Sequence, residues 1–306
     1  MGKLLYTKKI PFSLEDWKNK TIIKLAAGSG CVMAVTKEGE VLQGITDEDK
    51  AAATKFWKNI KDVAVSKVYC GMAIGLVKDG TCMISKKPLR TYIEGNGLSQ
   101  WHFERVNNAV KSWKDIVQVA CSDAFFALDA GGKVHCAEYD NSDDYYAANN
   151  WKGIARIVPG NQNSLFGITY QGNVLCSGGN LSGSYRANMR TKLLNLECVV
   201  DIWALGSECE KILYATKEGC VYNLEGELIA EGCARKAPVF DGNFVICGIR
   251  MADGSMKLHM YNQQKDLQIV EKWEEITGFA IGDSGYGNAF VIGTCSRTTL
   301  WNKLFG

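Results

Sequence analysis

The amino-acid sequence predicts an all-β protein, a seven-bladed β-propeller closed by its N-terminal strand. Three observations predict this fold: a glycine turn that recurs along the chain, a tryptophan that precedes it at a nearly constant distance, and a short apolar N-terminal segment outside the repeats. A recurrence of about 40 residues is typical of propeller blades of four strands. The chain of 306 residues is therefore expected to be one domain, residues 1–306.

The glycine turn is clearest in Thr36–Val41, which returns nearly unchanged as Thr216–Val221. A Glu-Gly or Asp-Gly step between apolar runs predicts a tight β-hairpin, because glycine adopts the positive φ that such turns need. Looser copies complete the series of marker glycines, which are Gly39, Gly80, Gly132, Gly172, Gly219 and Gly254.

A tryptophan opens most units and is usually followed by lysine and then isoleucine. The clearest cases begin at Trp57, Trp113 and Trp151, with variants at Trp17 and Trp273. Between the two markers lie an apolar run, a small-residue turn and a second apolar run. Short β-branched runs bounded by glycine turns predict strands.

Counting both markers gives seven units, although the fifth and sixth lack the tryptophan and the seventh lacks the glycine. Lys3–Tyr6 has no unit of its own, so we expect it to supply the missing strand of the last blade and close the ring, which removes exposed sheet edges. The units lie near residues 17–42, 57–83, 113–136, 151–176, 198–222, 234–258 and 273–301.

The pattern Trp-x-x-Ile, Ala-Ala-Gly, an apolar strand and Lys-x-Asp/Glu-Gly-x-Val resembles the regulator-of-chromosome-condensation repeat, in its degenerate bacterial form. The resemblance covers nearly the whole chain and implies a seven-bladed propeller. The family repeat usually carries a His-Thr pair after the glycine turn. The pairs found there instead are Cys31-Val32, Met72-Ala73 and Ala124-Phe125. The loops by which the eukaryotic founder promotes nucleotide exchange on a small GTPase have no match, so that activity is not implied.

The amino-acid composition limits the classes of partner that we expect. A net charge of +2, from 35 basic and 33 acidic residues, predicts no basic stripe, so nucleic-acid binding is not expected. No apolar stretch approaches the roughly 18–20 residues of a membrane helix, and the N-terminus lacks a secretory signal core. We therefore expect a cytoplasmic protein without membrane association, whose 12 cysteines are mostly buried thiols.

Neither a metal centre nor a catalytic site is expected. The three histidines, His102, His135 and His259, stand in different units, whereas zinc needs converging ligands. His135 is expected to be a half-buried strand residue. The acidic residues near Asp140 lack the spacing of a calcium loop, and the chain has no G-x-S-x-G motif. The sequence thus predicts no cofactor and no enzymatic activity.

Long insertions follow the third strand of several units, roughly at residues 43–56, 84–112, 137–150 and 177–197. Because turns alternate between the two faces of a propeller, these insertions are expected to gather on one face. Loops on a rigid scaffold are frequent binding sites.

The insertions contain side chains of the types that dominate protein interfaces. The candidate protein-binding residues are Arg90, Tyr92, Trp101, His102, Arg105, Tyr139, Asp143, Asp144, Tyr145, Tyr146, Tyr185 and Arg186. The leading hypothesis is a non-enzymatic scaffold that binds an unidentified protein through these loops. Two alternatives stay open: the aromatic residues pack their own loops against the ring, or the central tunnel holds a small ligand or substrate.

Overall fold

The structure is a computed structural model of the chain. It describes residues 3–7, 10, 12–45, 54, 56–69, 71–85, 100–138, 146–160, 164–178, 186–206, 209, 211–236, 238–243, 245–260, 273–283 and 289–295.

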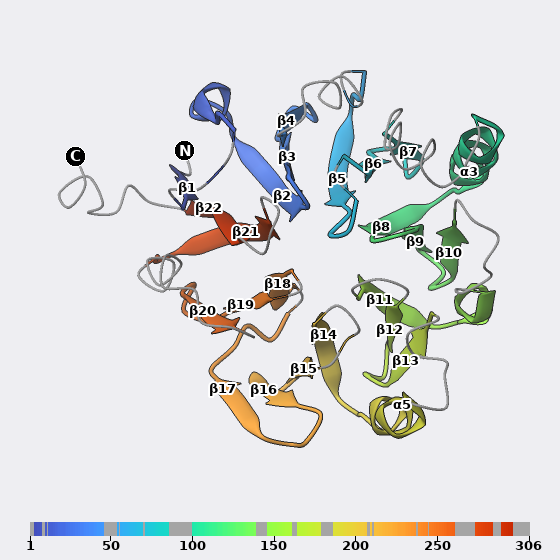
Figure 1. Cartoon of the computed structure of the whole chain (residues 1–306), viewed down its shortest axis with the longest axis vertical. Coiled ribbons are helices and arrows are strands. Elements are labelled where there is room, and N and C mark those ends of the chain that lie inside the picture. The colour runs from blue at the N-terminus through green and yellow to red at the C-terminus, as the bar shows by residue number, and fades with distance from the viewer. Residues whose placement is uncertain are drawn as a thin grey trace.

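Small antiparallel sheets are arranged around a common axis (Figure 1), which confirms the predicted all-β propeller architecture. The described residues form seven such sheets, six of three strands and one of four. We number the sheets one to seven in chain order.

Within each sheet the strands lie side by side, and they are named here in order from the axis outward (Figure 1). Sheets one to three consist of β2 (Ile22–Gly28), β3 (Cys31–Thr36) and β4 (Val41–Ile45); β5 (Ile60–Val65), β6 (Ala73–Val77) and β7 (Cys82–Ile84); and β8 (Ile116–Cys121), β9 (Phe125–Asp129) and β10 (Val134–Ala137). Sheets four and five consist of β11 (Ile154–Pro159), β12 (Leu165–Thr169) and β13 (Val174–Ser177); and β14 (Val199–Leu205), β15 (Lys211–Thr216), β16 (Cys220–Asn223) and β17 (Leu228–Glu231). Sheets six and seven consist of β18 (Phe240–Gly242), β19 (Ile246–Arg250) and β20 (Met256–Met260); and β21 (Ile276–Asp283), β22 (Ala289–Cys295) and β1 (Lys3–Tyr6).

Sheet seven combines the N-terminal strand with the last two described strands. The N-terminal strand β1 pairs antiparallel with β22, with Lys3 opposite Cys295 and Tyr6 opposite Ile292. The backbone N–H of Thr7 donates to the carbonyl of Val291 at 3.1 Å and extends this pairing. The apolar segment outside the repeats is therefore a strand of sheet seven.

The marker glycines lie in the hairpin turns and all have positive φ, between 78° and 93°. They also touch the next sheet: a Cβ on Gly39 would lie 3.0 Å from the Cα of Asn59, and one on Gly172 would lie 3.0 Å from the Cα of Cys198. The glycine carbonyls accept hydrogen bonds from that sheet, as in Ile60 N–H to Gly39 at 3.0 Å. Glycine is thus required at this turn for its conformation and for the close approach between sheets.

The opening tryptophans pack over glycines in the middle strands. A Cβ on Gly75 would come within 2.8 Å of the Trp57 ring, and one on Gly167 within 2.8 Å of the Trp151 ring. Sheet five lacks the tryptophan, and Tyr214 occupies the register position that these glycines hold. The indole therefore needs the space that a small middle-strand residue leaves.

Helical segments occupy the insertions, where the sequence analysis expected loops. They are α3 (Gln100–Ser112), α5 (Ala187–Leu194) and η3 (Tyr146–Asn150), with η1 (Glu15–Trp17) before the first sheet. Val106 and Val110 of α3 are buried, and so is Leu193 of α5. Both helices lie at the outer rim of the ring (Figure 1), beside β7 and β13 respectively.

The described parts of the insertions thus follow the rim, whereas the sequence analysis expected the insertions to gather on one face. The physical reason is that the third strand is outermost. The chain leaves it at the outer edge, and an amphipathic helix can cover that edge. None of the described helices is long and apolar enough to cross a membrane.

The described cysteines are all free, and most are buried, as the composition predicted. Burial raises the pKa of the Cys82 thiol to about 12 and raises the pKa values of Cys121 and Cys247 well above the usual value. These thiols therefore stay protonated and pack as small apolar groups. Cys198 differs, because it is exposed.

Candidate functional site

The predicted protein-binding residues fall mostly outside the described part of the chain. Those outside it are Arg90, Tyr92, Tyr139, Asp143, Asp144, Tyr145 and Tyr185. Trp101 and His102 lie in the first turn of α3, and Tyr146 begins η3, but their side chains are not among those described.

The structure describes the side chains of the two remaining candidates, Arg105 and Arg186. Arg105 of α3 is half-buried and donates from Nη2 to the carbonyl of Glu138 at 2.9 Å, which ties the helix to the end of β10. Arg186, just before α5, is buried. The Arg105 side chain thus holds its insertion against the end of β10.

A ring of polar side chains on the innermost strands was missed by the sequence analysis. The register shifts by one residue at the same place in several innermost strands, as between Ile22 and Lys24 or between Ile154 and Arg156. A β-bulge re-aims the side chain beside it. The polar residues that follow these shifts are Lys24, Asp62, Gln118, Arg156 and Asp201.

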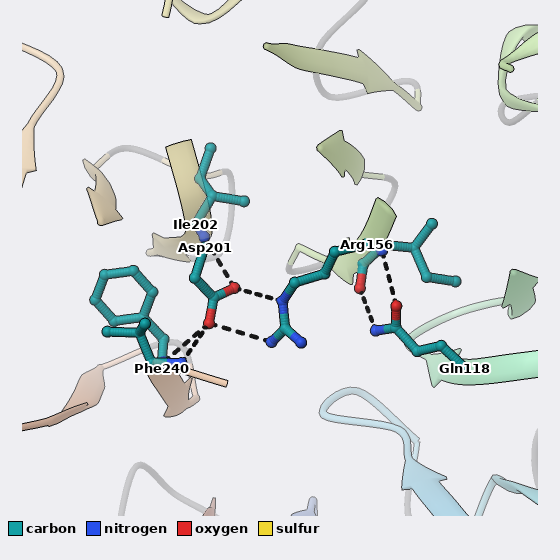
Figure 2. A network of polar contacts seen from close by, with 7 residues as sticks. Gln118, Arg156, Asp201, Ile202 and Phe240 are labelled. Atoms are coloured by element: carbon teal, nitrogen blue, oxygen red, sulfur yellow. Dashed lines mark hydrogen bonds and ion pairs between the residues drawn. The ribbon is translucent and has the colours of Figure 1, made fainter. Parts of the chain in front are cut away.

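Asp201 is the centre of this network (Figure 2). Arg156 of sheet four donates to it through two bonds, Nε to Oδ1 at 2.8 Å and Nη2 to Oδ2 at 3.1 Å. The carboxylate also accepts the N–H groups of Val239 at 2.7 Å and Phe240 at 3.1 Å from sheet six, and that of Ile202 at 3.0 Å. Asp201 is fully buried, so one carboxylate links three consecutive sheets.

Gln118 makes the corresponding link between sheets three and four. Its Nε2 donates to the carbonyl of Ile157 at 2.7 Å, and its Oε1 accepts the N–H of Ile157 at 3.0 Å (Figure 2). The inner edge of each innermost strand would otherwise leave backbone groups without partners. Side chains from the preceding sheet therefore satisfy the backbone edge that faces the axis.

Lys67 crosses the ring. It follows β5, yet its Nζ lies 3.0 Å from Asp241 Oδ1 and 2.9 Å from the carbonyl of Ile281, on strands across the axis (Figure 1). The ammonium also lies over the Trp203 ring, 5.7 Å from its centroid. Asp241 completes the contact by accepting the Ile281 N–H at 2.7 Å. Lys67 thus joins sheet two to sheets five, six and seven.

The turns that end the innermost strands form another set of links. Ser29 N–H donates to the Ser66 carbonyl at 3.2 Å, and the Ser66 hydroxyl donates to the Ser122 carbonyl. Gly30 N–H donates to the Asp283 carbonyl at 2.7 Å, which joins sheet one to sheet seven. A Cβ on Gly28 would lie 1.9 Å from the Ser66 carbonyl oxygen, so only glycine allows this approach.

The innermost strands enclose a central cavity of about 300 Å³. Its wall includes the charged side chains of Lys24, Lys67, Arg156, Asp241 and Arg250, together with apolar side chains and strand edges. Lys24 forms an ion pair with Asp62 at 3.0 Å. Most of these charges therefore hold sheets of the ring together.

The described histidines have structural environments. His135 is half-buried, as predicted, and its Nε2 lies 3.0 Å from Asp129 Oδ2. Asp129 Oδ1 also accepts the N–H groups of Gly131 and Lys133, so this pair belongs to a hairpin turn. Burial lowers the pKa of His259. Within the described residues, no group of three or more His, Cys, Asp or Glu side chains is arranged to hold a metal ion.

Several solved structures have a fold similar to that of this chain. The chain is similar to human WBSCR16, with a TM-score of 0.61 and 11% identity over 92% of this chain and 88% of that chain. It is similar to Prp20p of Saccharomyces cerevisiae, with a TM-score of 0.53 and 12% identity over 97% and 92% of the two chains. It is also similar to yeast RCC1 (Prp20) in the structure with Kap60, with a TM-score of 0.57 and 12% identity over 97% and 90%.

These neighbours are β-propellers of the RCC1 type, so the resemblance noted in the sequence is confirmed in the structure. The sequence matches no family model and no curated protein. At 11–12% identity the likeness shows the fold and nothing finer. The chain has the fold of the regulator-of-chromosome-condensation propellers.

Proposed function

We propose that the chain is a closed seven-bladed propeller that acts as a non-enzymatic, cytoplasmic scaffold and binds a protein through the insertions after its third strands. The observation that carries the proposal is the contrast between a cross-linked ring and insertions that extend from its outer edge. Loops and short helices on a rigid frame lose little conformational entropy on binding, which favours their use as binding surfaces.

The described residues support the rigid half of this contrast. Asp201, Gln118 and Lys67 connect successive or opposite sheets through hydrogen bonds between buried or half-buried groups. Such links fix the positions at which the insertions leave the ring. The pairing of β1 with β22 adds the same restraint between the N-terminal strand and the last described strand.

The insertions supply the surface. They contain most of the aromatic and arginine residues singled out in the sequence, and Leu194 at the end of α5 is 44% exposed. Exposed large apolar side chains beside a polar rim are typical of protein interfaces. We therefore include the rim around α3 and α5 in the proposed surface.

Two solved structures of the yeast neighbour Prp20 concern its protein partners. Prp20p is described with binding properties to Gsp1p and histones, and yeast RCC1 is described bound to Kap60. These partners belong to those proteins. Their bearing here is that a propeller of this type can serve as a protein-binding platform.

The test is affinity capture from the source cell with the full chain as bait. A partner held by the wild type should be lost when residues 137–150 are truncated or when Tyr145 and Tyr146 are both changed to Ala. The matched control is Tyr170→Ala, because Tyr170 is 60% exposed but lies in a hairpin turn outside the insertions. Capture of the same partner by the truncated chain, at an unchanged melting temperature, would overturn the proposal.

A further inference from the structure

The short first strand of sheet six exposes a residue of the second strand to the central cavity. β18 has three residues, whereas β2 and β14 each have seven. Arg250, the last residue of β19, therefore lines the cavity together with Phe240. Its backbone is fixed, because its N–H donates to the Val239 carbonyl at 2.8 Å.

The charges around the cavity do not balance. Three lining cations have a carboxylate partner: Lys24 pairs with Asp62, Lys67 with Asp241, and Arg156 with Asp201. Among the described residues, the Arg250 guanidinium has neither a hydrogen-bond nor an ion-pair partner, although the side chain is half-buried. Arginine stays protonated at any physiological pH. One positive charge of the wall is therefore left without a counter-charge.

The surroundings of Arg250 favour a small organic anion. A positive charge beside low-dielectric walls attracts an anion more strongly than the same charge in open solvent. The planar guanidinium offers paired donors that match a carboxylate or a phosphate group. Apolar wall residues such as Val63, Val119 and Phe279 can cover a short hydrocarbon body. A volume of about 300 Å³ is at the lower end of the range for ligand pockets, so the ligand must be small.

The position of the cavity is also consistent with entry from one end. Arg250 lies opposite Met256 at a marker-glycine hairpin, so it is near the end where the innermost strands begin. The contact between Lys67 and Asp241 crosses the axis beyond β5, near the opposite end. A ligand on Arg250 therefore does not need to displace the Lys67 link.

We propose that the central cavity is a binding site for a small anion whose carboxylate or phosphate group pairs with Arg250. The site is separate from the insertions and does not depend on the protein-binding function proposed above.

The experiment measures the melting temperature of the full chain with three probes at constant ionic strength: hexanoate, its neutral isostere hexanamide, and inorganic phosphate. A probe at about ten times its dissociation constant should raise the melting temperature by about 2–4 °C. We expect hexanoate or phosphate to do so and hexanamide to have no effect. Hexanoate as the better probe would identify the ligand as a carboxylate, and phosphate as the better probe would identify it as a phosphate.

The test variant is Arg250→Gln, which should weaken binding of the active probe at least tenfold. Arg235→Gln is the matched control, since Arg235 is exposed and does not line the cavity. If Arg250→Gln fails to fold, Arg250→Lys keeps the charge but loses the paired donors, and it should bind more weakly than the wild type. Equal stabilisation by hexanoate and hexanamide, no stabilisation by either anion, or undiminished binding by Arg250→Gln would overturn the proposal.

Discussion

The interface between sheets one and two and the interface between sheets four and five use one design with different side chains. At the same bulge position, Lys24 pairs with Asp62 in the first interface and Arg156 pairs with Asp201 in the second. The side chains of Lys24 and Asp62 are 41% and 20% exposed, whereas those of Arg156 and Asp201 are 21% and 0% exposed. Water screens the first pair more than the second, in which the fully buried Asp201 carboxylate must be satisfied by protein groups.

This comparison shows that an equivalent position in a repeat does not have an equivalent energetic weight. Asp62 accepts one backbone N–H, that of Val63, beyond its ion pair. Asp201 accepts three, two of which belong to another sheet. The difference should decide what the loss of each carboxylate costs.

The largest expected effect is that of Asp201→Ala. The variant leaves the Arg156 guanidinium without its partner and leaves the N–H groups of Val239 and Phe240 buried without an acceptor. Breaking a buried pair of this kind costs about 3–5 kcal/mol of the free energy of unfolding. Urea denaturation of the variant and the wild type measures it. A loss below about 1 kcal/mol would contradict the role given to Asp201.

The hairpin glycines should contribute equally to the stability of the two interfaces. Gly39 and Gly172 both have positive φ, at 90° and 93°, and at both a Cβ would lie 3.0 Å from the next sheet. Gly39→Ala and Gly172→Ala should each cost about 1–3 kcal/mol, because alanine is strained in this conformation and its Cβ contacts backbone. Denaturation curves should give similar losses. A large difference between the two would show that the turns are not equivalent.

The half-exposed ion pair of Lys24 and Asp62 should be weak and sensitive to salt. Asp62→Ala is expected to cost at most about 1 kcal/mol, since surface pairs are screened. The cost should shrink when the denaturation is repeated in about 1 M NaCl, whereas the cost of Asp201→Ala should hardly change. A salt-independent loss at Asp62 would show that its bond to Val63, and not the ion pair, provides the stability.

The smallest effect concerns the residue just before the first strand of a sheet, which lies against the hairpin glycine of the preceding sheet. Asn59 and Cys198 both have left-handed backbones, with φ of 57° and 58°. Asparagine tolerates this conformation better than cysteine does. Cys198→Asn should therefore raise the free energy of unfolding by a few tenths of a kcal/mol, and Asn59→Cys should lower it by a similar amount. Thermal melts of the reciprocal variants check the two signs.

Positions that recur with the same residue type in several sheets could be predicted from the sequence, whereas positions whose residue type changes from sheet to sheet could not. The marker glycines and tryptophans were visible because each recurs at a nearly fixed spacing and has one steric role, as Gly39 and Trp57 show. Gly75 and Gly167 were overlooked, although the glycine in the middle strand is the partner of the tryptophan. Their signal was present, since Tyr214 stands at that position where the tryptophan is missing.

The inner polar network was hidden for another reason. Arg156 and Asp201 are 45 positions apart, and the residue type at the bulge changes from sheet to sheet, so no motif repeats. The helix α3 did leave a signal, because Phe103, Val106 and Val110 have helical spacing. The candidate protein-binding site was harder still to predict from the sequence. Most of its residues lie outside the described chain, and interface side chains follow no period that a sequence could display.

The pairing of β1 with β22 has a consequence for the order of folding. The N–H of Val291 donates to the Thr7 hydroxyl across 284 positions of the chain. During synthesis, β1 cannot pair until β22 has been made, after nearly all of the rest of the chain. Contacts so distant in sequence are slow to form. Closure should therefore be the last event of folding, and a ribosome-bound chain that stops before residue 289 should expose the unpaired edge of β1 to chaperones or to other chains.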